Sequence, residues 1–119
     1  MRIAIPASDT TPAALVEARF ARAPLFRVFD DASASWETVE NTQVLNAVQG
    51  AGIQAAETLV RHQVNALLAT HCGPKAFRAL QAAGISVYTG VTGKIDEAVR
   101  LFLAGSLQPA VGPDVEGHW

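Results

Sequence analysis

The chain has 119 residues, half of them hydrophobic, which is enough for one domain with a buried core and no disulfides. Nine Lys and Arg against eleven Asp and Glu give a net charge of −2, without the basic excess typical of nucleic-acid-binding or membrane-surface proteins. The single cysteine, Cys72, cannot form an intrachain disulfide and is consistent with a reducing compartment. No apolar run is as long as a membrane span, and Pro6 interrupts the N-terminus too early for a signal peptide. We therefore expect a soluble cytoplasmic protein.

Hydrophobic patterning in the first half of the chain predicts three short strands, at residues 2–7, 24–31 and 36–42. The first is an apolar run, and residues 8–19 after it are expected to form a polar loop. In the second strand, Phe26 and Val28 would share one face. A turn at residues 31–35 predicts a hairpin between the second and third strands.

The second half of the chain alternates helices, expected at residues 50–62, 74–83 and 94–104, with buried strands, expected at 64–69 and 85–88. Pro74 suits a first helical position, where its missing N–H costs nothing, and Gly84 suits a helix end. The order β-β-β-α-β-α-β-α predicts an α/β sandwich with a mixed sheet. We expect a single domain over residues 1–108 and a flexible C-terminal tail over residues 109–119, which are rich in Pro and Gly.

Glycine-bearing turns precede all three expected helices and contain Gly50, Gly52, Gly73 and Gly93. Unpaired backbone N–H groups and the helix dipole make such helix starts natural anion sites. Lys75 and Lys94 lie in first helical turns, where a cation opposes the dipole unless an anion lies nearby. The alternative, that both lysines are simply solvated helix-end residues, stays open from the sequence.

His71 and Cys72 directly follow a predicted buried strand and join an imidazole to a thiol. This pair favours soft or borderline metals such as copper, zinc or iron, and the following helix start would lower the thiol pKa. A buried thiol that only packs is the alternative. One cysteine cannot build an iron–sulfur cage, which usually takes four. Catalysis by Cys72 is disfavoured because no acidic residue is placed to complete a triad.

Two motifs resemble nucleotide-binding sequences but lack their context. The Gly50–Ala55 stretch matches G-x-G-x-x-A, yet it does not directly follow a strand and has no acidic residue about 20 positions on. Gly93-Lys94 lacks the full phosphate-loop spacing. Arg19 and Arg22, three residues apart before a strand, could instead reach a shared anion, although two surface arginines over a packed Phe20 would give the same pattern.

Five segments resemble, in order, motifs of the nitrogenase iron–molybdenum cofactor biosynthesis family (NifX/NifB C-terminal-like). They are Met1–Pro6 ("KIAIP"), Arg19–Phe26 ("HFGRAPYF"), Gly50–Ala56 ("GAGIQAA"), Gly73–Phe77 ("GPKAF") and Ala83–Tyr88 ("AGIKVY"). The resemblance implies a ribonuclease-H-like fold, a three-layer sandwich around a five-stranded mixed sheet. It also implies a non-enzymatic protein that binds or carries a metal–sulfur cofactor or its precursor.

The chain departs from the family pattern at two places. Arg19 and Ala21 replace a frequent His and Gly, and His71-Cys72 replaces a small or apolar pair. In these departures the chain resembles family members that bind a mixed molybdenum–copper sulfide cluster. Another molybdenum or iron sulfide cluster is the alternative. Such a polyanion supplies its own bridging sulfides and needs cations, backbone N–H groups and one soft contact.

The resemblance therefore implies a set of cofactor-binding residues, Arg19, Arg22, Gly50, Gly52, Gly73, Lys75, Gly93 and Lys94, and a metal contact at Cys72 and His71. A second hypothesis is a metal-free interaction or regulatory module that docks a partner ATPase or carrier protein. A thiol-dependent enzyme is the third, disfavoured reading. Neither nucleic acid nor a membrane is expected as a partner.

Overall fold

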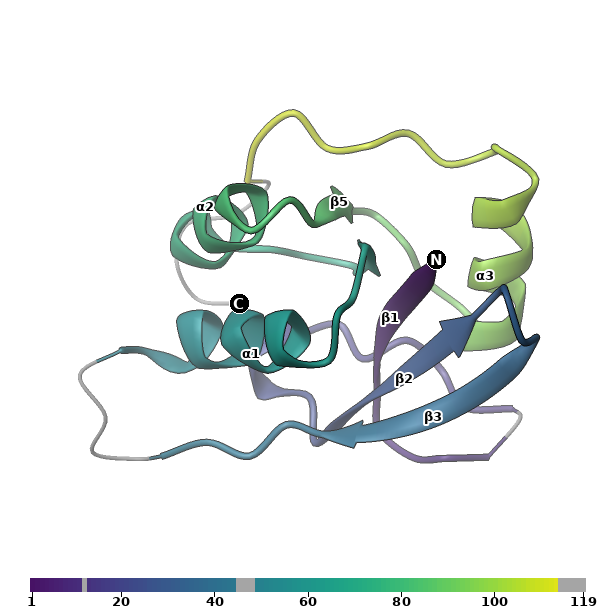
Figure 1. The fold of residues 1–119 in the computed structure, drawn as a ribbon, viewed down its shortest axis with the longest axis horizontal. Helices are drawn as coiled ribbons and strands as arrows, with labels where there is room; N and C mark the ends of the chain where they lie inside the picture. The colour runs from purple at the N-terminus through teal and green to yellow at the C-terminus, as the bar shows by residue number, and fades with distance from the viewer. Residues whose placement is uncertain (12, 45–48, 114–119) are drawn as a thin grey trace.

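The structure, a computed structural model, describes residues 1–11, 13–44 and 49–113 (Figure 1). Its strands are β1 (Arg2–Ala7), β2 (Leu25–Asp30), β3 (Ser35–Glu40), β4 (Ala66–Leu68) and β5 (Ser86–Tyr88). Its helices are α1 (Ala51–Arg61), α2 (Pro74–Ala82), α3 (Ile95–Leu103) and the short 3-10 helix η1 (Phe20–Arg22). All eight strands and helices expected from the sequence are present, with ends that differ by at most two residues. Within the described ranges, no helix is long and apolar enough to cross a membrane.

The five strands form one mixed sheet in the order β3-β2-β1-β4-β5. β1 pairs with β2, and β2 with β3, in antiparallel register, whereas β1–β4 and β4–β5 are parallel pairs. The predicted hairpin, mixed sheet and fold class are therefore confirmed. The hairpin extends the sheet on one side of β1, and the strands connected by helices extend it on the other.

Helices cover both faces of the sheet, which gives the three expected layers (Figure 1). Alternation along β1 decides which core each residue joins. Ala4 faces α1 and α2, in a cluster that includes Phe26 and Leu80, whereas Ile3 and Ile5 face α3 in a second cluster. Burial of these two apolar surfaces holds the helices against the sheet, and it places each helix start near the edge where the parallel strands end.

The expected buried strand at residues 64–69 is shorter in the structure. The Val64 N–H donates to the Leu59 carbonyl at 3.2 Å and so belongs to the end of helix α1. The Asn65 N–H donates to the Arg2 carbonyl at 2.8 Å, which brings the chain alongside β1. The apolar run therefore serves both as a helix end and as a strand, a division that hydrophobicity alone does not reveal.

Candidate functional site

Three helix starts lie at the edge of the sheet where the parallel strands end. Helices α2 and α3 follow β4 and β5, and α1 runs back toward the start of β4, so all three begin near this edge. The first turns of α1 and α2 touch: a Cβ added at Gly52 would lie 3.2 Å from the Cβ of Ala76. We call this region, residues 14–22, 50–52, 69–75 and 89–95, the carboxyl edge. The glycine-bearing turns after β4 and β5 open at this same edge because the two strands are parallel neighbours.

Residues 14–19 cross the carboxyl edge and connect two of its turns with strand β1. The Val16 N–H donates to the Gly93 carbonyl at 2.8 Å, and the Glu17 N–H donates to the Pro6 carbonyl at 2.8 Å. At the far end, Arg19 forms a parallel bridge with His71. The segment expected to be a polar loop is therefore tied by main-chain hydrogen bonds to the ends of β1, β4 and β5. This pairing brings Arg19 beside His71, 52 positions later in the chain.

Asn41 holds the arginine-bearing segment in place. Its side-chain Nδ2 donates to the carbonyl oxygens of Ala21, at 3.2 Å, and Ala23, at 2.8 Å. Asn41 is 8% exposed, so these bonds are shielded from water and also satisfy a buried amide. Sequence reasoning missed this residue because nothing in its neighbourhood indicates a partner some 20 positions earlier in the chain.

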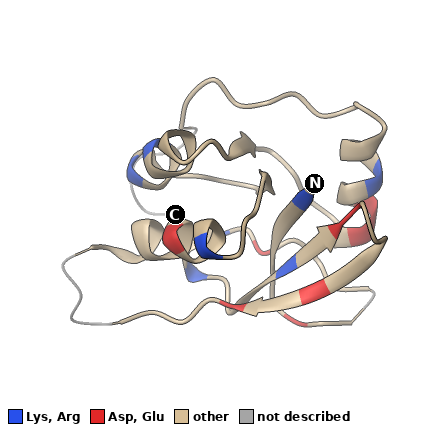
Figure 2. Ribbon diagram, in the orientation of Figure 1, with Lys and Arg blue, Asp and Glu red and all other residues tan. Residues whose placement is uncertain are grey.

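The four predicted cations lie on different parts of the carboxyl edge. Arg19 precedes η1 and Arg22 is its last residue, whereas Lys75 lies in the first turn of α2 and Lys94 is the residue before α3. All four side chains are exposed. Leu15 forms an antiparallel bridge with Lys94. The segment at residues 14–19 therefore links two of the cationic positions, Arg19 and Lys94. Figure 2 shows the Lys and Arg residues spread over several elements, with Asp and Glu among them.

Acidic groups accompany these cations. Glu17 Oε1 lies 3.9 Å from Nε of Arg19, whose side chain is 60% exposed. Asp9, just after β1, accepts hydrogen bonds from the side-chain hydroxyl and the backbone N–H of Thr11, which hold the pKa of its carboxyl below the ordinary value. The region thus carries charges of both signs, and Arg19 has an acidic neighbour in Glu17.

His71 and Cys72 differ in their access to solvent. His71 is half-buried at the carboxyl edge, whereas Cys72 is 0% exposed and belongs to the core cluster on the α1 and α2 face. The Cys72 Sγ lies 3.9 Å from the Gly73 carbonyl. Among the described residues, no three His, Cys, Asp or Glu side chains gather as a metal-binding group.

The glycines of this edge have distinct structural roles. Gly93 has a φ of +87°, a conformation that other residues rarely adopt, and it shapes the turn that leads into α3. Gly52 permits the close approach of α1 and α2. Gly50 and Gly73 directly precede α1 and α2, and as glycines they offer no side chain to cap the first N–H groups of these helices.

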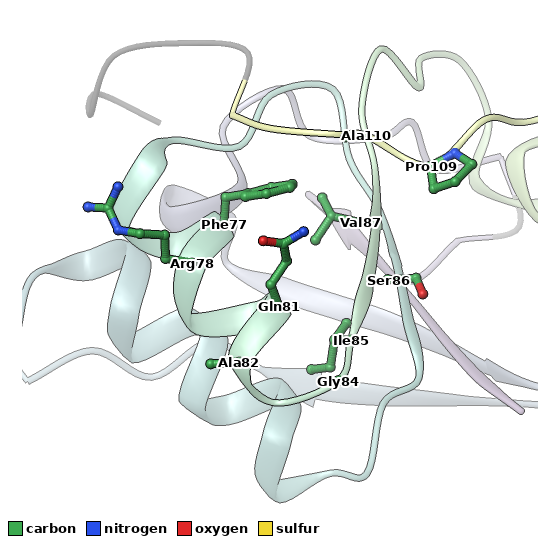
Figure 3. Close-up of a pocket in the computed structure, with 10 residues that line it drawn as sticks. All are labelled: Phe77, Arg78, Gln81, Ala82, Gly84, Ile85, Ser86, Val87, Pro109 and Ala110. Atoms are coloured by element: carbon green, nitrogen blue, oxygen red, sulfur yellow. The ribbon is translucent and has the colours of Figure 1, made fainter.

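An open groove of about 740 Å³ lies elsewhere, between α2, β5 and residues 109–110 (Figure 3). None of the ten residues predicted for the site lines it. Sequence reasoning missed this groove because Phe77, Ile85 and Val87 read as ordinary core positions. The third wall comes from the expected tail: the Ala110 N–H donates to the Val87 carbonyl at 2.8 Å. Residues 114–119 lie outside the described residues.

The chain belongs to the dinitrogenase iron-molybdenum cofactor family, whose model matches residues 1–105. The apo form of the orange protein from Desulfovibrio gigas is similar, with 41% identity, a TM-score of 0.89 and 96% of each chain covered. The solution structure of a Thermotoga protein assigned to NifB is 35% identical, with a TM-score of 0.81 over 98% of each chain. An uncharacterised protein of Methanocaldococcus jannaschii, MJ0580, is 32% identical over 111 residues, which cover 91% of this chain and 90% of that protein. The family resemblance predicted from the five motifs is confirmed.

Proposed function

We propose that this protein binds and carries a molybdenum-containing sulfide cluster, of the molybdenum–copper type, at the carboxyl edge. The observation that carries the proposal is the convergence at this edge of three helix starts and of the Arg19–His71 bridge. Membership of a cofactor family supports the coarser function of cluster binding. The composition of the cluster is our inference from the donor groups that this chain offers.

The proposed cradle uses charge and backbone N–H groups more than side-chain ligation. The uncapped first turns of α1 and α2 offer N–H groups toward an anion. Arg19, Arg22, Lys75 and Lys94 supply positive charge that can move toward the ligand, since all four side chains are exposed. A sulfide-rich cluster suits this arrangement because its metals already have sulfur ligands and its surface is negatively charged.

We assign the soft contact at the surface to His71. Its backbone pairs with Arg19, so a cluster that binds one of these residues lies within reach of the other. Cys72 lies beneath the surface at 0% exposure, and its thiol would reach a cluster only if the turn at residues 69–73 opened. Cys72 can therefore contact the metal only when the turn at residues 69–73 opens, and a Cys72→Ser variant tests this.

The role we propose is non-catalytic. The sequence predicts no set of nucleophile, base and orienting acid around Cys72. In the structure the Cys72 thiol is buried, so a substrate has no direct access to it. A cytoplasmic location is part of the same proposal and is supported by the single cysteine.

The experiment is reconstitution of the apo-protein with thiomolybdate and copper, followed by visible absorption and elemental analysis of the desalted product. We expect a coloured protein that retains molybdenum, copper and sulfide in fixed ratio. A colourless protein without molybdenum would refute the proposal and favour a metal-free module that docks a partner ATPase or carrier. Retention of iron in place of copper would keep the carrier function and overturn the molybdenum–copper assignment.

A further inference from the structure

A small pocket lies beside the β2–β3 hairpin, on the face of the sheet that α3 covers. It has a volume of about 220 Å³ and is lined by Thr10, Thr11, Arg27, Trp36, Ile95 and Asp96. Pockets for drug-sized ligands measure about 300–1,000 Å³, so this one suits a smaller molecule. Of its lining residues only Ile95 belongs to the carboxyl edge, and none is among the residues predicted for the cluster site.

Arg27 brings to this pocket a positive charge that forms no ion pair within the described chain. In β2 it alternates with Leu25 and Phe29, which face the cluster under α3. Its Nη1 donates to Oγ1 of Thr38, the residue opposite it on β3, and its guanidinium carbon lies 5.4 Å from the centroid of the Trp36 ring. Its Nε is buried without a hydrogen-bond partner among the described residues. Neutral groups therefore hold the guanidinium in place, and its charge remains available to an anion.

Asp96 brings the opposite charge to the same pocket from α3. It is the second residue of that helix, is exposed, and accepts a hydrogen bond at Oδ1 from the Glu97 N–H at 2.8 Å. Although both line this small pocket, Arg27 and Asp96 form no ion pair with each other. Thr10 and Thr11 add two hydroxyls, and that of Thr11 donates its proton to a neighbouring carboxylate, so its oxygen can still accept. The pocket thus offers a partner for an anionic group and another for a cationic group.

We propose that this pocket binds a free α-amino acid with an apolar side chain. The ligand carboxylate lies at the guanidinium of Arg27, its ammonium at Asp96 and the Thr11 hydroxyl, and its side chain against Trp36 and Ile95. A zwitterion suits the pocket because each of its charges meets a protein group of opposite sign. An ion of one charge would meet one attractive and one repulsive group. The proposal does not depend on cluster binding, because it concerns a different ligand and different residues.

The test is a titration of the full-length apo-protein with L-leucine, followed by tryptophan fluorescence. A Trp119→Phe background leaves Trp36 as the only indole of the chain. We expect a saturable change in its fluorescence, because the ligand side chain packs against this ring. Two analogues of leucine serve as matched ligands: 4-methylpentanoate lacks the amino group, and 3-methylbutylamine lacks the carboxylate. Each should bind at least about tenfold more weakly than L-leucine, because it loses one charge-assisted contact.

Substitutions test the two charged residues separately. Arg27→Gln and Asp96→Asn should each weaken the binding of L-leucine about tenfold. In Asp96→Asn, 4-methylpentanoate should bind nearly as well as L-leucine, because the partner of the amino group has been removed. Glu97→Gln is the matched control and should bind as the wild type does, because Glu97 is the next acid on α3, is exposed and does not line the pocket.

Three outcomes would overturn the proposal. The first is the absence of a saturable change up to about 10 mM L-leucine. The second is equal binding of L-leucine and either analogue to the wild type, which would make the pocket a site for a single charge. The third is an equal effect of Asp96→Asn and Glu97→Gln. The comparison of the analogues decides the question even if Arg27→Gln does not fold. These titrations contain no metal or sulfide, so they and the reconstitution with thiomolybdate and copper fail separately.

Discussion

The pair formed by Arg19 and Glu17 allows a test of the polyanion cradle in which two substitutions have opposite effects. Arg19→Ala removes a cation from the carboxyl edge and leaves the main-chain bridge to His71 available, whereas Glu17→Gln removes the acid 3.9 Å from Arg19 Nε. If a polyanion binds here, the first change weakens binding and the second strengthens it. If the Arg19–Glu17 pair only stabilises the fold, neither substitution alters cluster binding.

The magnitudes follow from the exposure of the two side chains. The Arg19 side chain is 60% exposed, so its contact belongs at the low end for charge-assisted bonds, about 1.5 kcal/mol or roughly tenfold in affinity. Two like charges about 6 Å apart in water repel each other by roughly 0.7 kcal/mol. If the Glu17 carboxylate lies at about this distance from the bound polyanion, Glu17→Gln removes the repulsion and should tighten binding about threefold.

The assay is titration of each apo-variant with thiomolybdate and copper, followed by visible absorption. Both effects should be clear at about 0.01 M salt, where the Debye length is about 30 Å, and should shrink at about 1 M, where it is about 3 Å. Arg100→Ala, which removes the exposed partner of Glu97 on α3, is the control and should bind as wild type does. Affinities of both variants within twofold of wild type, or weakening by both, would refute the reasoning.

Three further substitutions probe the architecture of the edge. Gly52→Val should lower the free energy of unfolding by about 1–3 kcal/mol in thermal denaturation, because its Cβ would lie 3.2 Å from a side-chain carbon of α2. Gly50→Val, with open space around its Cβ, is the matched comparison, and equal losses would contradict the close-contact explanation. Cys72→Ser should lower the free energy of unfolding by about 1–3 kcal/mol in chemical denaturation, because it buries a hydroxyl in an apolar cluster. If the visible spectrum of the reconstituted variant differs from that of the wild type, the turn at residues 69–73 opens and the thiol contacts the metal–sulfur cluster. His71→Ala should reduce the copper retained after desalting by at least half, and full retention would remove His71 from the proposed site.

Local features of the sequence determined most of the fold. The short apolar run around Leu67 is a fully buried strand as expected, and it pairs in parallel with β5. The expectation of a second fully buried strand was wrong, because β5 lies at the edge of the sheet and only Val87 in it is buried. Pro74 at the first position of α2 and Gly84, with a φ of +81°, mark the limits of that helix as expected. These signals are readable because backbone geometry and side-chain periodicity act over a few residues.

Only the tertiary structure decided which of the candidate residues meet. Arg19 lies beside His71, and Leu15 beside Lys94, because the order of the strands carries the segment at residues 14–19 across the ends of β1, β4 and β5. Cys72 could have faced solvent or core from its position after β4, and packing against the α1 and α2 face decided for the core. The sequence by itself determined which helices and strands form, and which residues carry charge or soft donor atoms. Side-chain direction and contacts between distant segments depend on how the layers pack, so the arrangement of the site followed only from the assembled fold.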